Sequence, residues 1–144
     1  KTINVASENP YWVSKDGVMY QREEDNKLAL ATYPRKKTDL SFSVGEDVSW
    51  IPSGTGMDRN SFLENIVFKS GKTTIGVEAL NGNSLKNVYL DFEDEDTGDT
   101  GLYLDGFKFD YYGSEEKHSH NIYMRKGTSL KHIAEELQGK VQYY

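Results

Sequence analysis

The sequence predicts a repeat or solenoid fold of the α+β class, in which a short stack of repeats forms a mostly parallel sheet. Three observations lead to this prediction. A four-residue pattern (asparagine, a β-branched residue, any residue, a large apolar residue) recurs at 65–68, 87–90 and 121–124. An Asp16-Gly17 pair separates two apolar runs, and apolar residues follow a helical spacing over 130–137. We therefore expect a repeat stack with an antiparallel β-hairpin insertion and a C-terminal capping helix.

The spacing of the pattern indicates the kind of repeat. Residues 63–68 and 85–90 resemble each other closely and stand 22 residues apart. A period of about 20 to 29 residues with one short strand per repeat is the signature of leucine-rich repeats. Weaker copies at 2–5 and 41–44 give anchor residues at Ile3, Phe42, Ile66, Val88 and Ile122, with spacings of 39, 24, 22 and 34 residues.

The two long spacings predict insertions between repeats. We place them at about 9–37 and 91–118, within a single domain that spans 1–144 and ends in a cap at 119–144. The length of 144 residues suits one domain with a core of its own.

The first insertion carries the clearest local signal. Asp-Gly between two β-prone runs favours a two-residue hairpin turn, because both central residues need positive φ. The runs 11–15 and 18–20 are followed by a third apolar run at 28–33 that stops at Pro34. The segment is therefore predicted to be a small antiparallel meander.

Apolar residues after each repeat strand are expected to line a returning segment. These are Val48 and Ile51 after the second strand, and Ile75, Ala79 and Leu80 after the third. A second hairpin is expected around Asp105-Gly106. At the C-terminal end, Leu130, Ile133, Ala134 and Leu137 follow the i, i+3, i+4, i+7 spacing of a helix, with Gly139 as its stop.

Composition excludes several functional classes. The net charge of −6 comes from six acidic residues between positions 91 and 99, and the remaining 17 acidic residues balance the 17 basic ones. No basic face is indicated, so nucleic acid is not an expected partner. The sequence has no cysteine and no apolar run long enough to span a membrane. Phosphate-loop and nucleophile-elbow motifs do not occur in a suitable context, so neither enzymatic activity nor a cofactor is expected.

The order of several short motifs resembles a known family. These motifs are similar to the BspA-like (Treponema pallidum-type) leucine-rich repeats of bacterial surface proteins. In order, they are Asn9-Pro10-Tyr11, Lys15 to Tyr20, Tyr33-Pro34, Ser41 to Val44, and then Val48 and Ile51. Residues 122–130, with Ala134, also resemble the closing strand and short helix of that family. The resemblance implies a secreted or surface-attached bacterial protein used in adhesion or protein recognition, with no catalytic residues to transfer.

Alternation along the repeat strands predicts which side chains face outward. Ile66, Phe68 and their counterparts in later repeats should point into the core. The residues between them should form a column on the outer face of the sheet, which we call the outward column. Its members are Asn4, Ser43, Val67, Tyr89 and Tyr123. We take Val67, Tyr89 and Tyr123, with the flanking Glu64 and Lys86, as candidate binding residues for a protein partner on a host or bacterial surface. The alternative is that the tyrosines only stack on each other or lie under the second insertion.

The asparagines of the pattern predict a structural feature. Asn65, Asn87 and Asn121 occupy the same position of successive repeats and are expected to form a ladder of side-chain amides.

Metal binding is a weaker hypothesis. Asp94, Asp96, Asp99 and Asp105 provide oxygen ligands for calcium, but an EF-hand needs glycine where Asp99 stands. A solvated acidic loop is the favoured interpretation. The histidines at 118, 120 and 132 are too few for an evident zinc site.

Two other functions stay open from the sequence. A carbohydrate-binding module would use aromatic side chains as a stacking platform, and the candidates are Trp12, Tyr103, Tyr111 and Tyr112. The chain could also be an accessory domain of a larger surface enzyme. The function favoured here is non-catalytic binding or adhesion at the bacterial cell surface or in a secreted protein, with glycan as a further partner class.

Overall fold

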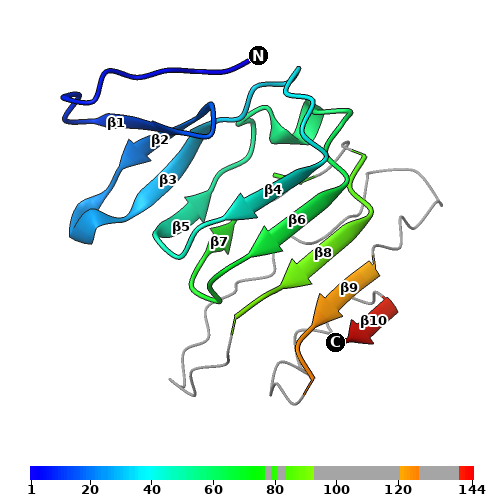
Figure 1. Cartoon of the computed structure of the whole chain (residues 1–144). Helices are drawn as coiled ribbons and strands as arrows, with labels where there is room; N and C mark the ends of the chain where they lie inside the picture. Colours follow the sequence, from blue (N-terminus) through cyan, green and yellow to red (C-terminus); the bar gives the residue numbers. More distant parts are fainter. Residues whose placement is uncertain (77–78, 81–83, 93–120, 127–139) are drawn as a thin grey trace.

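The strands of the chain form two sheets that face each other. The computed structural model describes residues 1–76, 79–80, 84–92, 121–126 and 140–144 (Figure 1). Within these ranges the strands make one five-stranded sheet in the order β10-β9-β8-β6-β4 and another in the order β1-β2-β3-β5-β7. We call the first the parallel sheet and the second the mixed sheet. The described residues contain two short 3-10 helices and no α-helix.

The parallel sheet is built from the recurring sequence pattern. Its strands are β4 (Ser41–Val44), β6 (Asn65–Phe68), β8 (Asn87–Leu90), β9 (Asn121–Met124) and β10 (Lys140–Tyr143). All four neighbouring pairs are parallel and in register, so that equivalent pattern positions lie side by side. The predicted repeat strands at 41–44, 65–68, 87–90 and 121–124 are confirmed.

The mixed sheet begins with the predicted meander. Strands β1 (Trp12–Lys15), β2 (Val18–Arg22) and β3 (Leu28–Thr32) are antiparallel. Asp16 and Gly17 have φ of 51° and 74°, as the expected two-residue turn requires. Strand β3 then pairs in parallel with β5 (Val48–Ile51), and β5 with β7 (Thr74–Ile75). The first insertion is therefore part of a second sheet, which the sequence did not predict.

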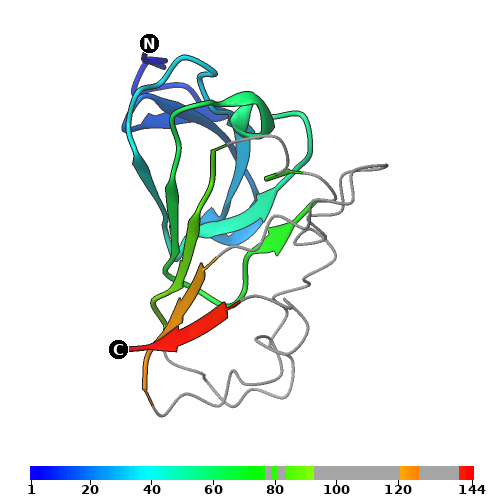
Figure 2. The same cartoon turned by 90° about the vertical axis from the view of Figure 1, so that its right-hand side faces the viewer.

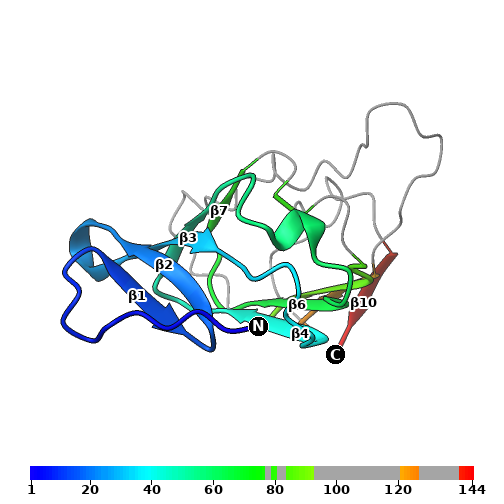
Figure 3. The ribbon, with the colours of Figure 1, turned by 90° about the horizontal axis from the view of Figure 1, so that it is seen from above.

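The chain alternates between the two sheets from β3 to β8. The chain runs from β4 in the parallel sheet to β5 in the mixed sheet, and likewise from β6 to β7. Figures 2 and 3 show the two sheets as opposite layers. Their inner side chains form one hydrophobic cluster that includes Leu30, Ile51, Ile66 and Val88. The inward positions of the predicted register are confirmed, because Ile66, Phe68, Val88, Leu90, Ile122 and Met124 are all buried.

The turn after β5 is organised by a buried asparagine. The 3-10 helix Met57–Arg59 leads to Asn60, whose side-chain Nδ2 donates to the carbonyl oxygens of Pro34 (3.2 Å) and Lys37 (2.9 Å). Its Oδ1 accepts hydrogen bonds from the backbone N–H groups of Phe62 and Leu63, both at 2.8 Å. One side chain thus ties the connection before β4 to the connection before β6. The other 3-10 helix, Glu24–Asn26, lies between β2 and β3.

The predicted first repeat strand at 2–5 is wrong. Residues 2–5 are in neither sheet, and they lie along the hairpin instead. The N–H of Ile3 donates to the carbonyl oxygen of Gly17 (3.0 Å), and the N–H of Val5 donates to Ser14 Oγ (3.1 Å). The hairpin therefore takes the hydrogen bonds that a repeat strand would have used. Asn4 does not belong to the outward column.

Two predictions cannot be compared with the structure. The capping helix over 130–137 and the hairpin around Asp105-Gly106 lie outside the described residues. Strand β10 was not predicted, because its sequence Lys140-Val141-Gln142-Tyr143 lacks the asparagine of the repeat pattern.

Candidate functional site

The outer face of the parallel sheet carries a row of in-register side chains that we call the central row. Its members are Ser43, Val67, Tyr89, Tyr123 and Gln142, one from each strand. The rings of Tyr89 and Tyr123 stack with their centroids 4.6 Å apart and an interplanar angle of 11°. The predicted adjacency of the tyrosines is confirmed, and so is the stacking that the alternative proposed. Both rings and Val67 are half-buried.

An amide row runs beside the central row. Asn65 Nδ2 donates to Ser41 Oγ (3.1 Å), Asn87 Nδ2 to Asn65 Oδ1 (2.7 Å), and Asn121 Nδ2 to Asn87 Oδ1 (3.0 Å). The predicted amide ladder is confirmed. It connects four strands by side-chain hydrogen bonds and holds them in one register.

A charged row flanks the central row on its other side. Asp91 Oδ2 pairs with Lys69 Nζ, and its Oδ1 accepts hydrogen bonds from Arg125 Nη2 (2.7 Å) and from the Tyr144 hydroxyl (3.3 Å). The hydrogen bonds from Lys69 and Arg125 hold the pKa of the Asp91 carboxyl below its usual range. The Asp91 carboxylate therefore stays ionised at neutral pH and forms ion pairs with the side chains of Lys69 and Arg125.

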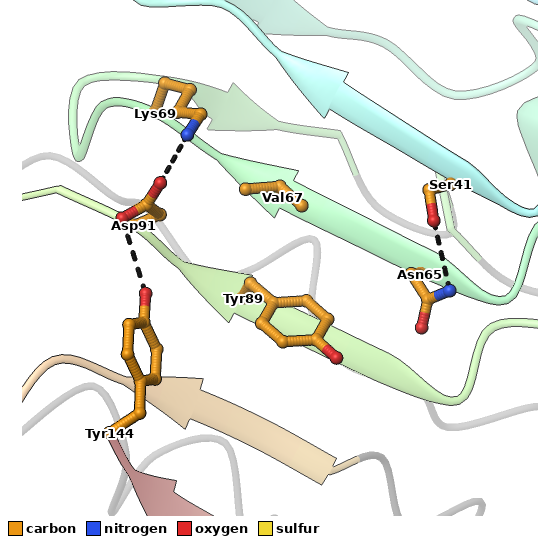
Figure 4. A pocket seen from close by; sticks show the side chains of 7 residues that line it. All are labelled: Ser41, Asn65, Val67, Lys69, Tyr89, Asp91 and Tyr144. Carbon is orange, nitrogen blue, oxygen red and sulfur yellow. Dashed lines mark hydrogen bonds and ion pairs between the residues drawn. The ribbon is translucent and has the colours of Figure 1, made fainter.

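Between these rows lies a shallow groove of about 460 Å³ (Figure 4). It is lined by Ser41 and Asn65 of the amide row, Val67 and Tyr89 of the central row, and Lys69, Asp91 and Tyr144 of the charged row. The surface thus offers an apolar and aromatic centre with polar groups at its margins, as protein-recognition surfaces do.

The other two predicted binding residues form an ion pair outside the groove. Lys86 Nζ lies 2.7 Å from Glu64 Oε1, and the two side chains are 61% and 36% exposed. They precede β8 and β6 and do not line the groove. A pair this exposed contributes little to stability.

The charged row was missing from the sequence prediction, although a signal for it exists. Lys69, Asp91 and Arg125 each stand two residues after a member of the central row. On a strand, a step of two residues returns to the same face. The same alternation that selected Val67, Tyr89 and Tyr123 therefore also selects these three residues.

The candidate metal ligands are not tested by the structure. Asp94, Asp96, Asp99 and Asp105 lie outside the described residues, as do the three histidines and the tyrosines at 103, 111 and 112. Within the described ranges, no three acidic or histidine side chains gather as a metal site would require. None of the helices described is long and apolar enough to cross a membrane.

Comparisons with solved structures identify the class of fold. A leucine-rich cell surface protein from Faecalibacterium prausnitzii A2-165 superimposes with a TM-score of 0.51 at 15% sequence identity. The alignment covers 99% of this chain and 41% of that protein. The pneumococcal vaccine antigen PcpA gives a TM-score of 0.46 at 13% identity, with 99% of this chain and 49% of PcpA covered. The likeness to the Faecalibacterium protein indicates a fold of the leucine-rich-repeat type.

The chain spans less than half the length of either solved protein. No protein-family model matches the chain, and no curated protein matches it. The likeness to the leucine-rich cell surface protein concerns the fold, and the specific BspA-like resemblance stays a prediction.

Proposed function

We propose that this chain is a non-catalytic binding domain of a bacterial cell-surface or secreted protein, and that the outer face of the parallel sheet recognises a protein partner. The observation that carries the proposal is the Tyr89–Tyr123 stack on two hydrogen-bonded strands. Its rings are ordered before any partner arrives. Binding therefore loses less side-chain entropy than it would with free tyrosines.

The rows beside the tyrosines support recognition of a protein. The amide row supplies hydrogen-bonding groups, and the charged row supplies Lys69, Asp91 and Arg125 at the margin. An aromatic centre with a polar rim is the usual composition of such an interface. The leucine-rich fold also places all of these groups on a continuous sheet, which suits an extended partner surface.

The electrostatics of the groove favour binding over catalysis. A general acid or base works best when its pKa lies near the operating pH. Lys69 and Arg125 move the Asp91 pKa in the opposite direction, away from neutrality. Asp91 is therefore proposed to order the rim of the surface.

The proposed location rests on the solved neighbour of the same fold. That neighbour is described as a leucine-rich cell surface protein. We propose the same location for this chain.

The proposal is tested by truncating the two tyrosines. Tyr89→Ala and Tyr123→Ala should each weaken partner binding by about 1–3 kcal/mol, as anchors of an interface do. Each should also lower stability by about 1 kcal/mol, because the ring stack is lost. Tyr89→Phe keeps the stacked ring and should bind nearly as well as wild type.

The partner is obtained by differential capture. Wild type, Tyr11→Ala and the Tyr89→Ala/Tyr123→Ala double variant are immobilised side by side and exposed to host-matrix and bacterial surface proteins. Tyr11 is 70% exposed and lies outside the groove, so it serves as the matched control. Wild type and Tyr11→Ala should retain the partner, and the double variant should not. In a titration, wild type and Tyr11→Ala should bind the partner with similar affinity, and the double variant should bind it more weakly. A folded double variant that binds the captured protein as tightly as wild type does would refute the proposal.

A further inference from the structure

A second groove lies on the outer face of the mixed sheet, away from the parallel sheet. Its volume is about 390 Å³, and its lining includes both tryptophans of the chain, Trp12 and Trp50. Trp50 is 38% exposed, so part of its indole is accessible to a ligand. This groove is distinct from the one assigned above to protein recognition, since the two share no lining residue.

Strand register places the two tryptophans in one row. Trp12 of β1 pairs with Gln21 of β2, Gln21 with Ala29 of β3, and Ala29 with Trp50 of β5. Paired residues of adjacent strands project from the same face. Three strand-to-strand steps place the two tryptophan backbones about 14 Å apart. Gln21 and Ala29 stand between the two tryptophans in this row, and all four residues line the groove.

A β-bulge is responsible for the outward position of Trp50. The pairing of β3 with β5 shifts from Leu28↔Val48 to Ala29↔Trp50, which leaves Ser49 as an extra residue. Strict alternation would put Trp50 on the same face as Val48, which is 3% exposed. The extra residue instead turns Trp50 outward and lets Ile51 return to the core, where it is fully buried. Bulges often re-aim a side chain at functional sites.

The polar groups of the groove restrict the ligand. Gln21 and Glu23 line it, and Glu23 is the one charged residue among the lining residues. Thr55 also lines it and carries a buried hydroxyl with no hydrogen-bond partner within the described ranges, whereas buried hydroxyls normally have one. The groove thus combines aromatic faces with hydrogen-bonding groups and has no cation to attract an acidic ligand.

We propose that this groove binds a neutral oligosaccharide, with pyranose rings packed against Trp12 and Trp50. One face of a β-linked pyranose presents C–H groups, which suit the flat apolar surface of an indole, while its hydroxyls face polar side chains. The distance between the indoles requires an extended ligand of several rings. Pockets with aromatic walls and a few placed polar groups are the usual form of a small-ligand site.

The chain contains its own reporter for this site. Both of its tryptophans line the groove, so a ligand-dependent change in tryptophan emission arises there. Wild type is titrated with cellohexaose, xylohexaose and laminarihexaose, and with hexagalacturonate as the acidic counterpart. At least one neutral hexasaccharide should give a saturable change, confirmed by calorimetry, and hexagalacturonate should bind at least tenfold more weakly.

Substitutions in the groove separate binding from folding. Trp12→Ala and Trp50→Ala should each weaken the affinity at least about tenfold, whereas Trp50→Phe should retain most of it. Ala29→Met should also weaken binding, because Ala29 lines the groove and a longer side chain there takes up part of its volume, while both tryptophans are retained. Tyr89→Ala/Tyr123→Ala is the matched control on the other sheet and should bind the oligosaccharide like wild type. Melting curves show which variants are folded.

Three outcomes would overturn the proposal. The first is the absence of saturable binding by any of the neutral hexasaccharides at millimolar concentration. The second is wild-type affinity in the folded tryptophan variants. The third is self-association of the wild type, measured by sedimentation, that Trp50→Ala abolishes, which would make the groove an interface between two copies of the chain. None of these outcomes bears on the protein-recognition face, whose test uses other residues.

Discussion

Asn60 joins two connections that are far apart in sequence. Its amide nitrogen donates a hydrogen bond to the carbonyl oxygen of Lys37, 23 residues earlier. Its amide oxygen accepts a hydrogen bond from the backbone N–H of Leu63, just before β6. The residue is fully buried, so water cannot replace these partners. A single side chain therefore fixes how the connection before β4 packs on the connection before β6.

Removal of this amide should be costly. Asn60→Ala leaves buried carbonyl and N–H groups unsatisfied, and we expect unfolding in denaturant to show a loss of about 2–3 kcal/mol. Asn9→Ala is the matched control, because Asn9 Oδ1 accepts hydrogen bonds from the N–H groups of Tyr11 and Trp12 at a turn that is only partly buried. The control should lose less than half as much. Equal losses would mean that burial of Asn60 is not the source of its effect.

At the scale of the element, the charged row depends on the ionisation of Asp91. The lowered pKa of the Asp91 carboxyl means that the native state binds fewer protons than the unfolded chain below neutrality. The ionised Asp91 carboxylate therefore stabilises the native state fully at pH values above 3.8, the ordinary pKa of an aspartate carboxyl. This contribution to stability is lost as the pH falls through the lowered pKa of Asp91. Salt should weaken the same contribution, since the side chains are partly exposed.

Comparison with Asp91→Asn isolates this effect. The difference in unfolding free energy between wild type and variant should be nearly constant over roughly pH 5 to 8 and should shrink below about pH 4. Glu64→Gln, which removes the exposed pair with Lys86, should change stability little at any pH. If the difference in unfolding free energy between wild type and Asp91→Asn stays the same in acid, the charge of the Asp91 carboxylate is not the source of the stabilisation.

The elements that the sequence predicted well are those whose signal is local. The Asp16-Gly17 turn requires positive φ, and four repeat strands follow one pattern of alternation, so both could be predicted without knowledge of the rest of the chain. The outward column followed from the same pattern, with Asn4 as the error.

The mixed sheet could not be predicted, because pairing of β3 with β5 is a contact between segments about 20 residues apart. The position of Trp50 depends on a one-residue bulge that alternation cannot reveal.

At the scale of the whole molecule, both sheets share one hydrophobic cluster. Val88 lies in the middle strand of the parallel sheet and is fully buried. Val88→Asp should unfold the described part of the chain, because a buried, unpaired carboxylate costs several kcal/mol, on the order of the whole stability. Circular dichroism should show the loss of both sheets together.

An outward substitution on β4, two strands away in the same sheet, provides the control for this experiment. Ser43 belongs to the same sheet but is exposed, and Ser43→Asp should melt close to wild type. If Val88→Asp also melts like wild type, the register between β6, β8 and β9 is incorrect.

The amide row has a consequence for solubility. Like residues stacked in register on parallel strands are also the arrangement from which fibrils grow, and asparagine ladders strengthen it. Strand β10 is the edge of the parallel sheet among the described strands, and the position in register with Asn121 is Lys140. The series of amides therefore stops one strand before that edge. Lysine on an edge strand is a common safeguard against edge-to-edge association. The asparagine pattern that joins the four repeat strands is thus not continued on the last described strand of the sheet.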